Sequence, residues 1–195
     1  PHGVPHVRHS NEYSKKEYKE SLGIPNKFII LLFGFIRRAK GYEYVIKAVE
    51  KIVTSQPYLK GKIRVILTGI PSPGEQSYLN YIKDLICKLG LEGIILVTTK
   101  YLNNDEIDLF FGAADMTIIP YTRRVGPSGV LSFALAYEVP SIITYDNKYL
   151  TRGMDLPTLT VNLNINEIAS AILELMNDEN KYAELIGKIK EYNAT

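Results

Sequence analysis

The chain has 195 residues, 46% hydrophobic and 23% charged, an ordinary balance for one globular domain with a buried core. Its net charge of +2 is too small for the basic face that nucleic-acid-binding domains carry. The single cysteine, Cys87, excludes an internal disulfide framework, and we expect it to be a small buried hydrophobe. No apolar run approaches the roughly 20 residues that cross a bilayer, and no signal peptide is visible, so we expect a cytoplasmic protein.

The first residues are expected to form a linker from a larger protein. The sequence opens with Pro1 and not with a methionine, so we expect a missing part that carries half of the active site. Residues 1–10 are rich in Pro, Gly and His, as in linkers. His2, His6 and His9 suggest a metal site, but no neighbouring Cys, Asp or Glu completes one, and the linker interpretation is favoured.

Ser14 and Glu17 have the spacing of a capping box, which predicts a short surface helix over 14–22 before Gly23. Six apolar runs that follow are typical of strands buried on both faces of a sheet. They cover 28–35, 62–68, 94–97, 115–119, 141–144 and 159–163. Segments with helical spacing occur at 42–53, 78–89, 104–111, 128–137, 166–176 and 179–192.

This alternation predicts a doubly wound, Rossmann-like α/β domain: a parallel six-stranded sheet with helices on both faces. We divide the chain into a linker with a short helix (1–24), the Rossmann-like domain (25–178) and a C-terminal helix (179–195). In such a sheet, ligands bind at the carboxyl ends of the strands, near the point where the strand order reverses.

The segment 121–143, YTRRVGPSGVLSFALAYEVPSII, is interpreted as a basic loop, a helix and a buried strand. Its helix should begin at Ser128, Gly129 and Val130. A helix start attracts anions, because free N–H donors and the positive end of the helix dipole coincide there. Arg123 and Arg124 would add charge and forked donors for phosphate. We therefore predict a phosphate site; an ordinary helix cap beside two solvated arginines is the alternative.

A second basic loop, GFIRRAKG at 34–41, follows the first strand. The usual doubly wound order places the first and fourth strands side by side, so both basic loops would face one crevice. Arg37, Arg38 and Lys40 would then lie opposite the helix start, and side-chain charges and backbone amides would together bind a diphosphate. We expect at least one of the two arginines to be merely solvated.

Several common active-site motifs do not occur in the sequence. No GxGxxG follows the first strand and no GxxxxGK[ST] is present, which disfavours a classical NAD site and a P-loop ATPase. There is no GxSxG, and all three histidines lie in the first ten residues, so a Ser/His/Asp hydrolase is disfavoured as well.

Four segments, in order, resemble glycosyltransferase family four (glycosyl transferases group 1). FGFIRRAKGYEYVIKAVEKI and VILTGIPSPGEQSYLNYIKDLICKLGL are similar to its first two strand–helix units, the first with a basic loop and Lys-Gly. YLNNDEIDLFFGAADMTIIPY resembles its A-A-D segment, and GPSGVLSFALAYEVPSIITYD its hallmark loop, helix and strand. The resemblance implies the C-terminal, nucleotide-sugar-binding domain of a retaining two-domain (GT-B) enzyme.

By this resemblance, Lys40 would bind the donor diphosphate with help from Arg37, and these two would be the catalytic residues. Arg37 is an inferred substitute, since the family usually has Arg where this chain has Phe35. The implied diphosphate and sugar contacts are Gly34, Ser128, Gly129, Val130, Arg123 and Arg124. The implied nucleobase contacts are Thr98, Thr99, Lys100, Tyr101 and Leu102.

The implied activity is hexosyl transfer, with retention, from a nucleotide-diphospho-sugar such as a UDP or GDP sugar. It needs no metal or other cofactor, because basic groups and amides neutralise the leaving diphosphate. The missing N-terminal domain would be a partner, the acceptor (glycan, lipid or small molecule) is unknown, and no nucleic acid is implied. The isolated fragment would be inactive, and many relatives contact membranes peripherally through the other domain.

One departure from the family bears on activity. The family's pair of glutamates, which bind the donor sugar and ribose, would fall on Val125 or Gly126 and on Phe133 or Ala134. Both carboxylates are therefore absent, and we expect Phe133 only to pack in the core. The alternative to an active transferase is a degenerate, non-catalytic nucleotide-sugar-binding or scaffolding domain. A different sugar-nucleotide enzyme of the same architecture, such as a 2-epimerase, is a further alternative.

Overall fold

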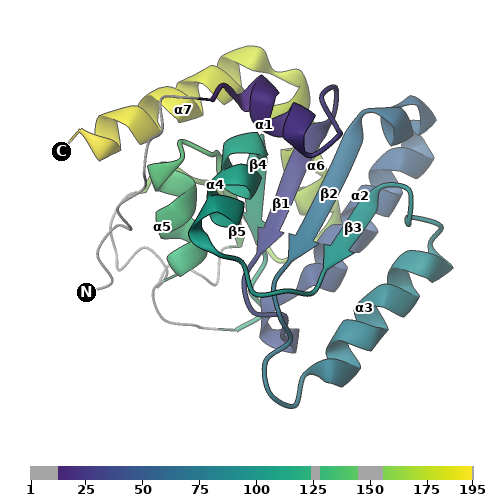
Figure 1. Ribbon diagram of the computed structural model, residues 1–195. Coiled ribbons are helices and arrows are strands. Elements are labelled where there is room, and N and C mark those ends of the chain that lie inside the picture. Colours follow the sequence, from purple (N-terminus) through teal and green to yellow (C-terminus); the bar gives the residue numbers. More distant parts are fainter. Residues whose placement is uncertain (1–12, 124–127, 145–155, 195) are drawn as a thin grey trace.

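A computed structural model describes residues 13–123, 128–144 and 156–194 of the chain. Its six strands form one parallel sheet in the order β3-β2-β1-β4-β5-β6 (Figure 1). The strands are β1 (Phe28–Phe33), β2 (Ile63–Thr68), β3 (Ile95–Thr98), β4 (Met116–Ile119), β5 (Ser141–Thr144) and β6 (Leu159–Val161). This confirms the predicted doubly wound sheet, and it places β1 beside β4 as expected.

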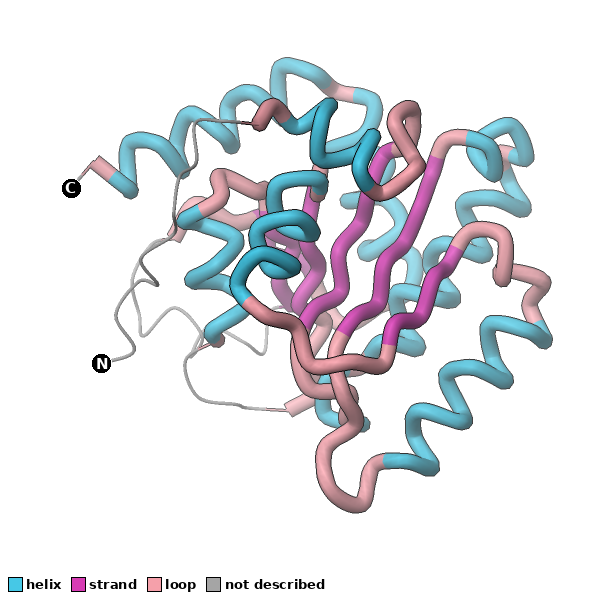
Figure 2. Tube along the Cα trace, viewed as in Figure 1, coloured by secondary structure: helices cyan, strands magenta, loops and turns pink. Residues whose placement is uncertain are grey.

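Helices cover both faces of the sheet (Figures 1 and 2). One face carries α2 (Tyr42–Ser55), α3 (Gln76–Lys88) and α6 (Ile165–Asn177). The other carries α1 (Lys15–Ser21), α4 (Asn104–Ala113), α5 (Gly129–Ala136) and α7 (Glu179–Asn193). Strand β1 explains why both faces need cover: Ile30 and Leu32 belong to the first core, and Ile29 and Leu31 to the second.

Two short 3-10 helices, η1 (Arg38–Lys40) and η2 (Pro57–Gly61), complete the described elements. Strand β1 ends two residues earlier than predicted, because Gly34 has a φ of 106° and turns the backbone out of the sheet. The prediction for Cys87 is wrong, since its thiol is exposed. Ile82 and Ile86 occupy the inward side of α3, and the residue after Ile86 is about 100° further around the helix.

The short helix α1 is joined to the body of the domain at the amino ends of the strands. Its predicted capping box is present, with Ser14 accepting from the Glu17 amide. Asp115, just before β4, pairs with Lys19 at 2.6 Å and with Lys15 at 3.6 Å, and it accepts from the Ile29 amide at 2.7 Å. One carboxylate therefore connects α1 to β1 and β4, opposite the edge where the two basic loops lie.

Gly41 is the point where the first basic loop touches the end of β4. It has a left-handed φ of 63°, and a Cβ built on it would lie 2.2 Å from the Pro120 carbonyl oxygen. Gly90 has nearly the same φ, 65°, but a Cβ there would meet nothing within 4 Å. Replacing each glycine by alanine therefore distinguishes two free-energy costs. The cost of the left-handed backbone arises at both positions, whereas the cost of close contact arises only at Gly41.

We expect Gly90→Ala to lower the free energy of unfolding by about 1–2 kcal/mol, the cost of a left-handed alanine. Gly41→Ala should cost at least about 2 kcal/mol more, because the added methyl must displace backbone at Pro120. Urea unfolding of both variants measures the difference. Equal destabilisation would contradict the close packing of this loop on β4.

Candidate functional site

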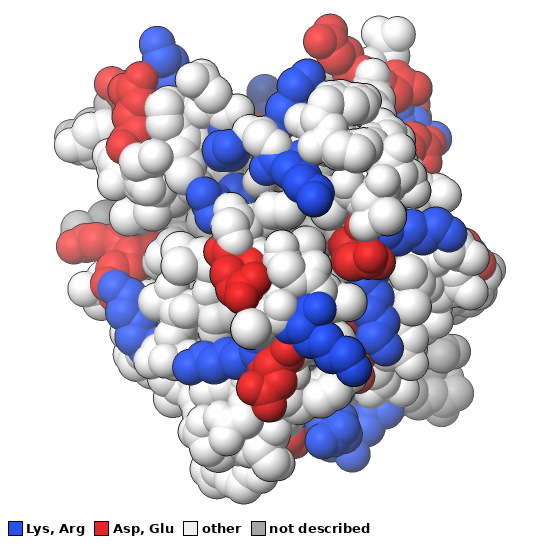
Figure 3. Space-filling view, turned by 90° about the vertical axis from the view of Figure 1, so that its right-hand side faces the viewer, with Lys and Arg blue, Asp and Glu red and all other residues white. Residues whose placement is uncertain are grey.

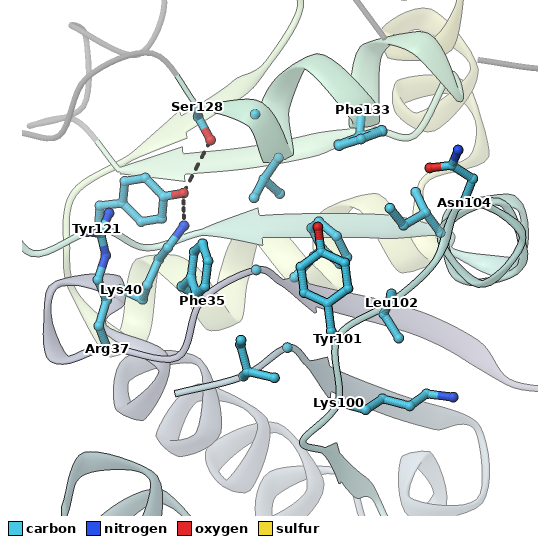
Figure 4. A pocket seen from close by; sticks show the side chains of 17 residues that line it. Phe35, Arg37, Lys40, Lys100, Tyr101, Leu102, Asn104, Tyr121, Ser128 and Phe133 are labelled. Carbon is cyan, nitrogen blue, oxygen red and sulfur yellow. Dashed lines mark hydrogen bonds between the residues drawn. The ribbon is translucent and has the colours of Figure 1, made fainter. Parts of the chain in front are cut away.

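A cavity of about 690 Å³ opens at the carboxyl ends of β1 to β4 (Figure 4). Its walls come from the segments that follow these strands and from the first turns of α4 and α5. The residues that line it are Phe33, Gly34, Phe35, Arg37, Lys40, Gly69, Ile70, Lys100, Tyr101, Leu102, Asn104, Ile107, Tyr121, Ser128, Gly129, Val130 and Phe133. The cavity therefore lies where a doubly wound sheet is expected to bind a ligand.

Lys40 is the most unusual of these residues, because its side chain is buried without a counter-charge. It is 6% exposed, its ammonium bonds to the Tyr121 hydroxyl, and its Nζ lies 4.0 Å from the centroid of the Tyr121 ring. In the described part of the chain, no carboxylate pairs with it. Burial, together with the smaller effect of the nearby Arg37 charge, lowers the pKa of Lys40 to about 7.

The start of α5 faces this lysine across Tyr121. Ser128 caps the helix, with its Oγ accepting from the Leu131 amide at 3.4 Å. The same Oγ lies 3.2 Å from the Tyr121 hydroxyl, which gives the line Lys40–Tyr121–Ser128 in Figure 4. The N–H groups of the first turn of a helix have no partner within that helix, and Gly129 and Val130 of this turn line the cavity.

Arg37 supplies a second unsatisfied cationic group. Its Nε is buried and has no hydrogen-bond partner among the residues that the structure describes, although Arg37 lines the cavity. A buried guanidinium donor left unpaired is costly, so this atom favours an acceptor from outside the chain. Arg38 points elsewhere: it does not line the cavity, it is exposed, and its guanidinium lies 5.3 Å from the Tyr78 ring centroid. The structure thus places Arg37 at the cavity and leaves Arg38 exposed, in agreement with the expectation that at least one of the two arginines is solvated.

At the opposite end of the cavity, the aromatic and apolar side chains of Tyr101, Leu102 and Phe133 lie beside the polar Lys100 and Asn104 (Figure 4). Phe133 does pack against the core, with its ring centroid 5.4 Å from Phe111 and 6.0 Å from Phe33. It is only half-buried, however, and also lines the cavity, so the prediction that it merely packs in the core was incomplete. Two aromatic side chains at the cavity remain exposed, Phe35 at 54% and Tyr101 at 79%.

Most of the residues predicted for the site do line one cavity. These are Gly34, Arg37, Lys40, Lys100, Tyr101, Leu102, Ser128, Gly129 and Val130. Thr98 and Thr99 do not line it, because β3 continues through Thr98 and the chain turns toward the cavity only afterwards. The Lys100 ammonium is bound to Glu106. The ligand-binding roles of all these residues stay predictions.

The two arginines predicted beside the helix start are not placed at the cavity. Arg123 is exposed and does not line it. Arg124 lies outside the described residues, as do Val125 and Gly126, where the first of the family's glutamates would fall. For the second glutamate, the structure distinguishes the two candidates: Phe133 lines the cavity, whereas Ala134 is fully buried in the core.

Several cavity residues were not predicted from the sequence, above all Tyr121, with Asn104 and Ile107 of α4. Asn104 and Ile107 follow Asn103, whose capping box with Glu106 starts α4. A tyrosine two residues after a buried strand was a signal, since the carboxyl end of that strand was already predicted to border the site.

Charged side chains of both signs are distributed over the surface shown in Figure 3, and the described acidic residues form no metal-binding cluster. On the face drawn in Figure 3, basic and acidic side chains are interspersed. Within 13–123, 128–144 and 156–194, no group of three or more His, Cys, Asp or Glu could hold a metal ion. In the same ranges, every helix is too short or too polar to cross a bilayer. The predicted independence of metal remains untested.

Two curated relatives illustrate the sequence similarity. The D-inositol 3-phosphate glycosyltransferase of Kineococcus radiotolerans is 27% identical over 100 residues, which are 51% of this chain and 23% of that protein. The enzyme of the same name from Thermobispora bispora is 22% identical over 173 residues, 88% of this chain and 40% of that protein. The chain thus spans less than half the length of these relatives.

Solved structures show the same fold. The Anabaena HepE protein in complex with UDP-glucose matches with a TM-score of 0.78 and 19% identity, over 92% of this chain and 47% of that one. The C-terminal domain of LpcC, a glycosyl transferase group 1 family protein from Francisella tularensis, matches with a TM-score of 0.76 and 18% identity, over 91% and 90%. The fold is therefore that of one Rossmann-like half of a GT-B glycosyltransferase.

The model of one protein family matches nearly all of the described chain. It is the model for glycosyl transferases group 1, and it matches residues 14–192. This range begins at the cap of α1 and ends within α7, so it includes both basic loops, the buried Lys40 and the start of α5. The chain belongs to the glycosyl transferases group 1 family.

Proposed function

We propose that this domain binds a nucleotide-diphospho-sugar, with the diphosphate between Lys40 and the start of α5. The observation that carries the proposal is the buried Lys40, a cation without a carboxylate partner among the described residues, opposite free helix amides. A desolvated cation and a helix N-terminus both favour an anion, and here they share one cavity.

The rest of the cavity supports a ligand with an anionic part and a ring system. Arg37 contributes, at the cationic end, a buried donor that has no partner in the described part of the chain. Leu102, Ile107 and Phe133 line the other end, where a sugar or base would find apolar surface. The HepE structures contain UDP and UDP-glucose, which is the chemical class proposed for this site.

The proposed reaction is transfer of a hexosyl group to an acceptor with retention of anomeric configuration. As the bond from the sugar to the diphosphate breaks, negative charge grows on the leaving diphosphate. Lys40, Arg37 and the α5 amides stabilise that charge without a metal ion. The acceptor (a glycan, a lipid or a small molecule) and its site belong to a further N-terminal domain, so this chain alone performs no transfer. We place the protein in the cytoplasm, with any peripheral membrane contact made by that other domain.

The proposal is tested by calorimetric titration of the chain with UDP-glucose, GDP-glucose and ADP-glucose, each with and without EDTA. We expect at least one to bind with a dissociation constant near the micromolar range, about −8 kcal/mol. EDTA should leave the affinity unchanged. Absence of binding by all three at millimolar concentration would refute the proposed function. The tightest binder of the three is called the reference nucleotide sugar below.

A second candidate is a nucleotide-sugar-binding domain without transfer activity. One observation favours it: among the described residues that line the cavity, none is Asp or Glu. Carboxylates commonly bind the hydroxyl groups of riboses, so the sugar part is contacted here by apolar and amide groups. Incorporation of labelled hexose into an acceptor by the protein with its N-terminal domain distinguishes the two, since only a transferase gives labelled product.

A further inference from the structure

The Tyr121 hydroxyl lies between the two halves of the cationic end of the cavity. It follows Pro120 at the end of β4, and its side chain is buried. On one side it bonds to the Lys40 ammonium of the first basic loop, and on the other it lies 3.2 Å from the Ser128 hydroxyl at the α5 cap. The Tyr121 hydroxyl therefore connects the first basic loop with the start of α5, the two segments that bind the diphosphate in the proposed function.

The direction of one of these two hydrogen bonds follows from the chemistry of the groups. A lysine ammonium can only donate, so the Tyr121 oxygen accepts from Lys40. Either hydroxyl can donate in the contact between Tyr121 and Ser128 Oγ, and the same Oγ accepts from the Leu131 amide. In the arrangement in which Tyr121 donates, the Ser128 hydroxyl hydrogen points into the cavity that Ser128 lines.

We infer that Tyr121 is a positioning residue of this site, whose hydroxyl directs both the Lys40 ammonium and the Ser128 hydroxyl hydrogen toward the bound diphosphate. The inference rests on the proposed function, which names the diphosphate. The described charged and titratable groups that face Lys40 are Arg37, on its own loop, and Tyr121, after β4. The proposed role of Tyr121 is to orient these two groups.

Tyr121→Phe tests this role, because it removes the hydroxyl and keeps the ring below Lys40. We expect it to bind the reference nucleotide sugar about 10-fold more weakly, as for loss of a hydrogen bond to a charged group. Ser128→Ala should weaken binding in the wild-type background but add little to Tyr121→Phe, because both changes interrupt the same line. Tyr137→Phe is the matched control: its hydroxyl bonds to Asp108, it does not line the cavity, and its affinity should equal wild type.

A measurement on the ligand-free chain separates this inference from the proposed function. Titration of the Lys40 side chain, followed by its ¹³Cε chemical shift, reports its protonation directly. Tyr121→Phe removes an acceptor that favours the charged form, so Lys40 should lose its proton at a lower pH than in wild type, while Tyr137→Phe leaves it unchanged.

Two outcomes would overturn the inference. One is a Tyr121→Phe variant that binds the reference nucleotide sugar as wild type does; the other is an unaltered Lys40 titration in that variant. Failure of the proposed function looks different, because then wild type binds none of the three nucleotide sugars while the Lys40 titration still responds to Tyr121→Phe. Thermal unfolding of each variant confirms that it is folded before either measurement is interpreted.

Discussion

Lys40→Met should weaken binding of the reference nucleotide sugar by about a hundredfold and, at neutral pH, make the ligand-free protein more stable. The loss of binding follows from removing a charged donor to the diphosphate, which contributes about 1.5–3 kcal/mol per hydrogen bond. The gain in stability follows from removing a buried charge that has no carboxylate partner among the described residues. Methionine has a similar length and carries no charge that would have to be removed from water.

The effect on stability has a defined pH dependence. The pKa of Lys40 is lowered to about 7 in the folded protein, from an ordinary value of 10.5 for a lysine side chain. Between these two values the unfolded chain holds more protons than the folded one, so the stability of wild type rises with pH. The gain in the free energy of unfolding of Lys40→Met over wild type is therefore fully present below pH 7 and disappears as the pH approaches 10.5. Thermal unfolding at pH 6, 8 and 10 measures it.

Lys100→Met is the matched control for Lys40→Met. Lys100 also lines the cavity, but its ammonium is half-exposed and bound to Glu106. Exposed ion pairs contribute little, so this variant should bind within a few-fold of wild type and show no gain in stability. If the two variants lost affinity equally, a general electrostatic attraction would explain the site better than a specific contact from Lys40.

The second large effect concerns pH and the ligand together. With a pKa of about 7, Lys40 is mostly neutral at pH 9 in the free protein, and the bound diphosphate requires its charged form. Binding above pH 7 must therefore take up a proton, and the affinity should fall by up to about a hundredfold between pH 6 and pH 9. A nucleotide sugar suits this test, because its diphosphate has no terminal monoester group, which would ionise near pH 6.

Two measurements verify this linkage. Calorimetry at pH 8 in buffers of different ionisation enthalpy should show uptake of close to one proton per ligand bound. Lys40→Arg carries a charge that does not titrate in this range, so its affinity should hardly change between pH 6 and pH 9. A wild-type affinity that is independent of pH would show that Lys40 is not in contact with the diphosphate.

The fold could be predicted from the sequence because its strongest signals are local. The short apolar run beginning at Phe28 is typical of a strand covered on both sides, and glycines stand where strands and helices end. The position of β1 beside β4 was predicted from the usual order of such sheets, since no local pattern specifies which strands become neighbours. Cys87 was predicted to be buried because it lies next to the buried side of its helix, but its actual position on the helix is exposed.

The candidate site was less predictable, because its geometry depends on contacts between distant segments. Lys40 and Ser128 were placed at one crevice by topology alone, but Tyr121, which joins them, was missed. A tyrosine after a strand can face solvent or the site, and its direction here depends on the loop around Gly41 that packs on Pro120. In the same way, the path of the chain after β3 decides that Tyr101 lines the cavity and Thr99 does not.

The pairing of β1 with β4 has a consequence for how the protein acquires its binding ability. Leu31 and Thr117, which are hydrogen-bonded across that pair, are 86 residues apart in the chain. During synthesis, Lys40 therefore emerges long before Tyr121 and Ser128, and a partly made chain that ends before Tyr121 holds only one half of the proposed anion site. The pairing of β1 with β4 must also close a long loop, which makes it slow to form. A ligand of the proposed site can therefore stabilise only chains that extend past Ser128 and have formed this pair.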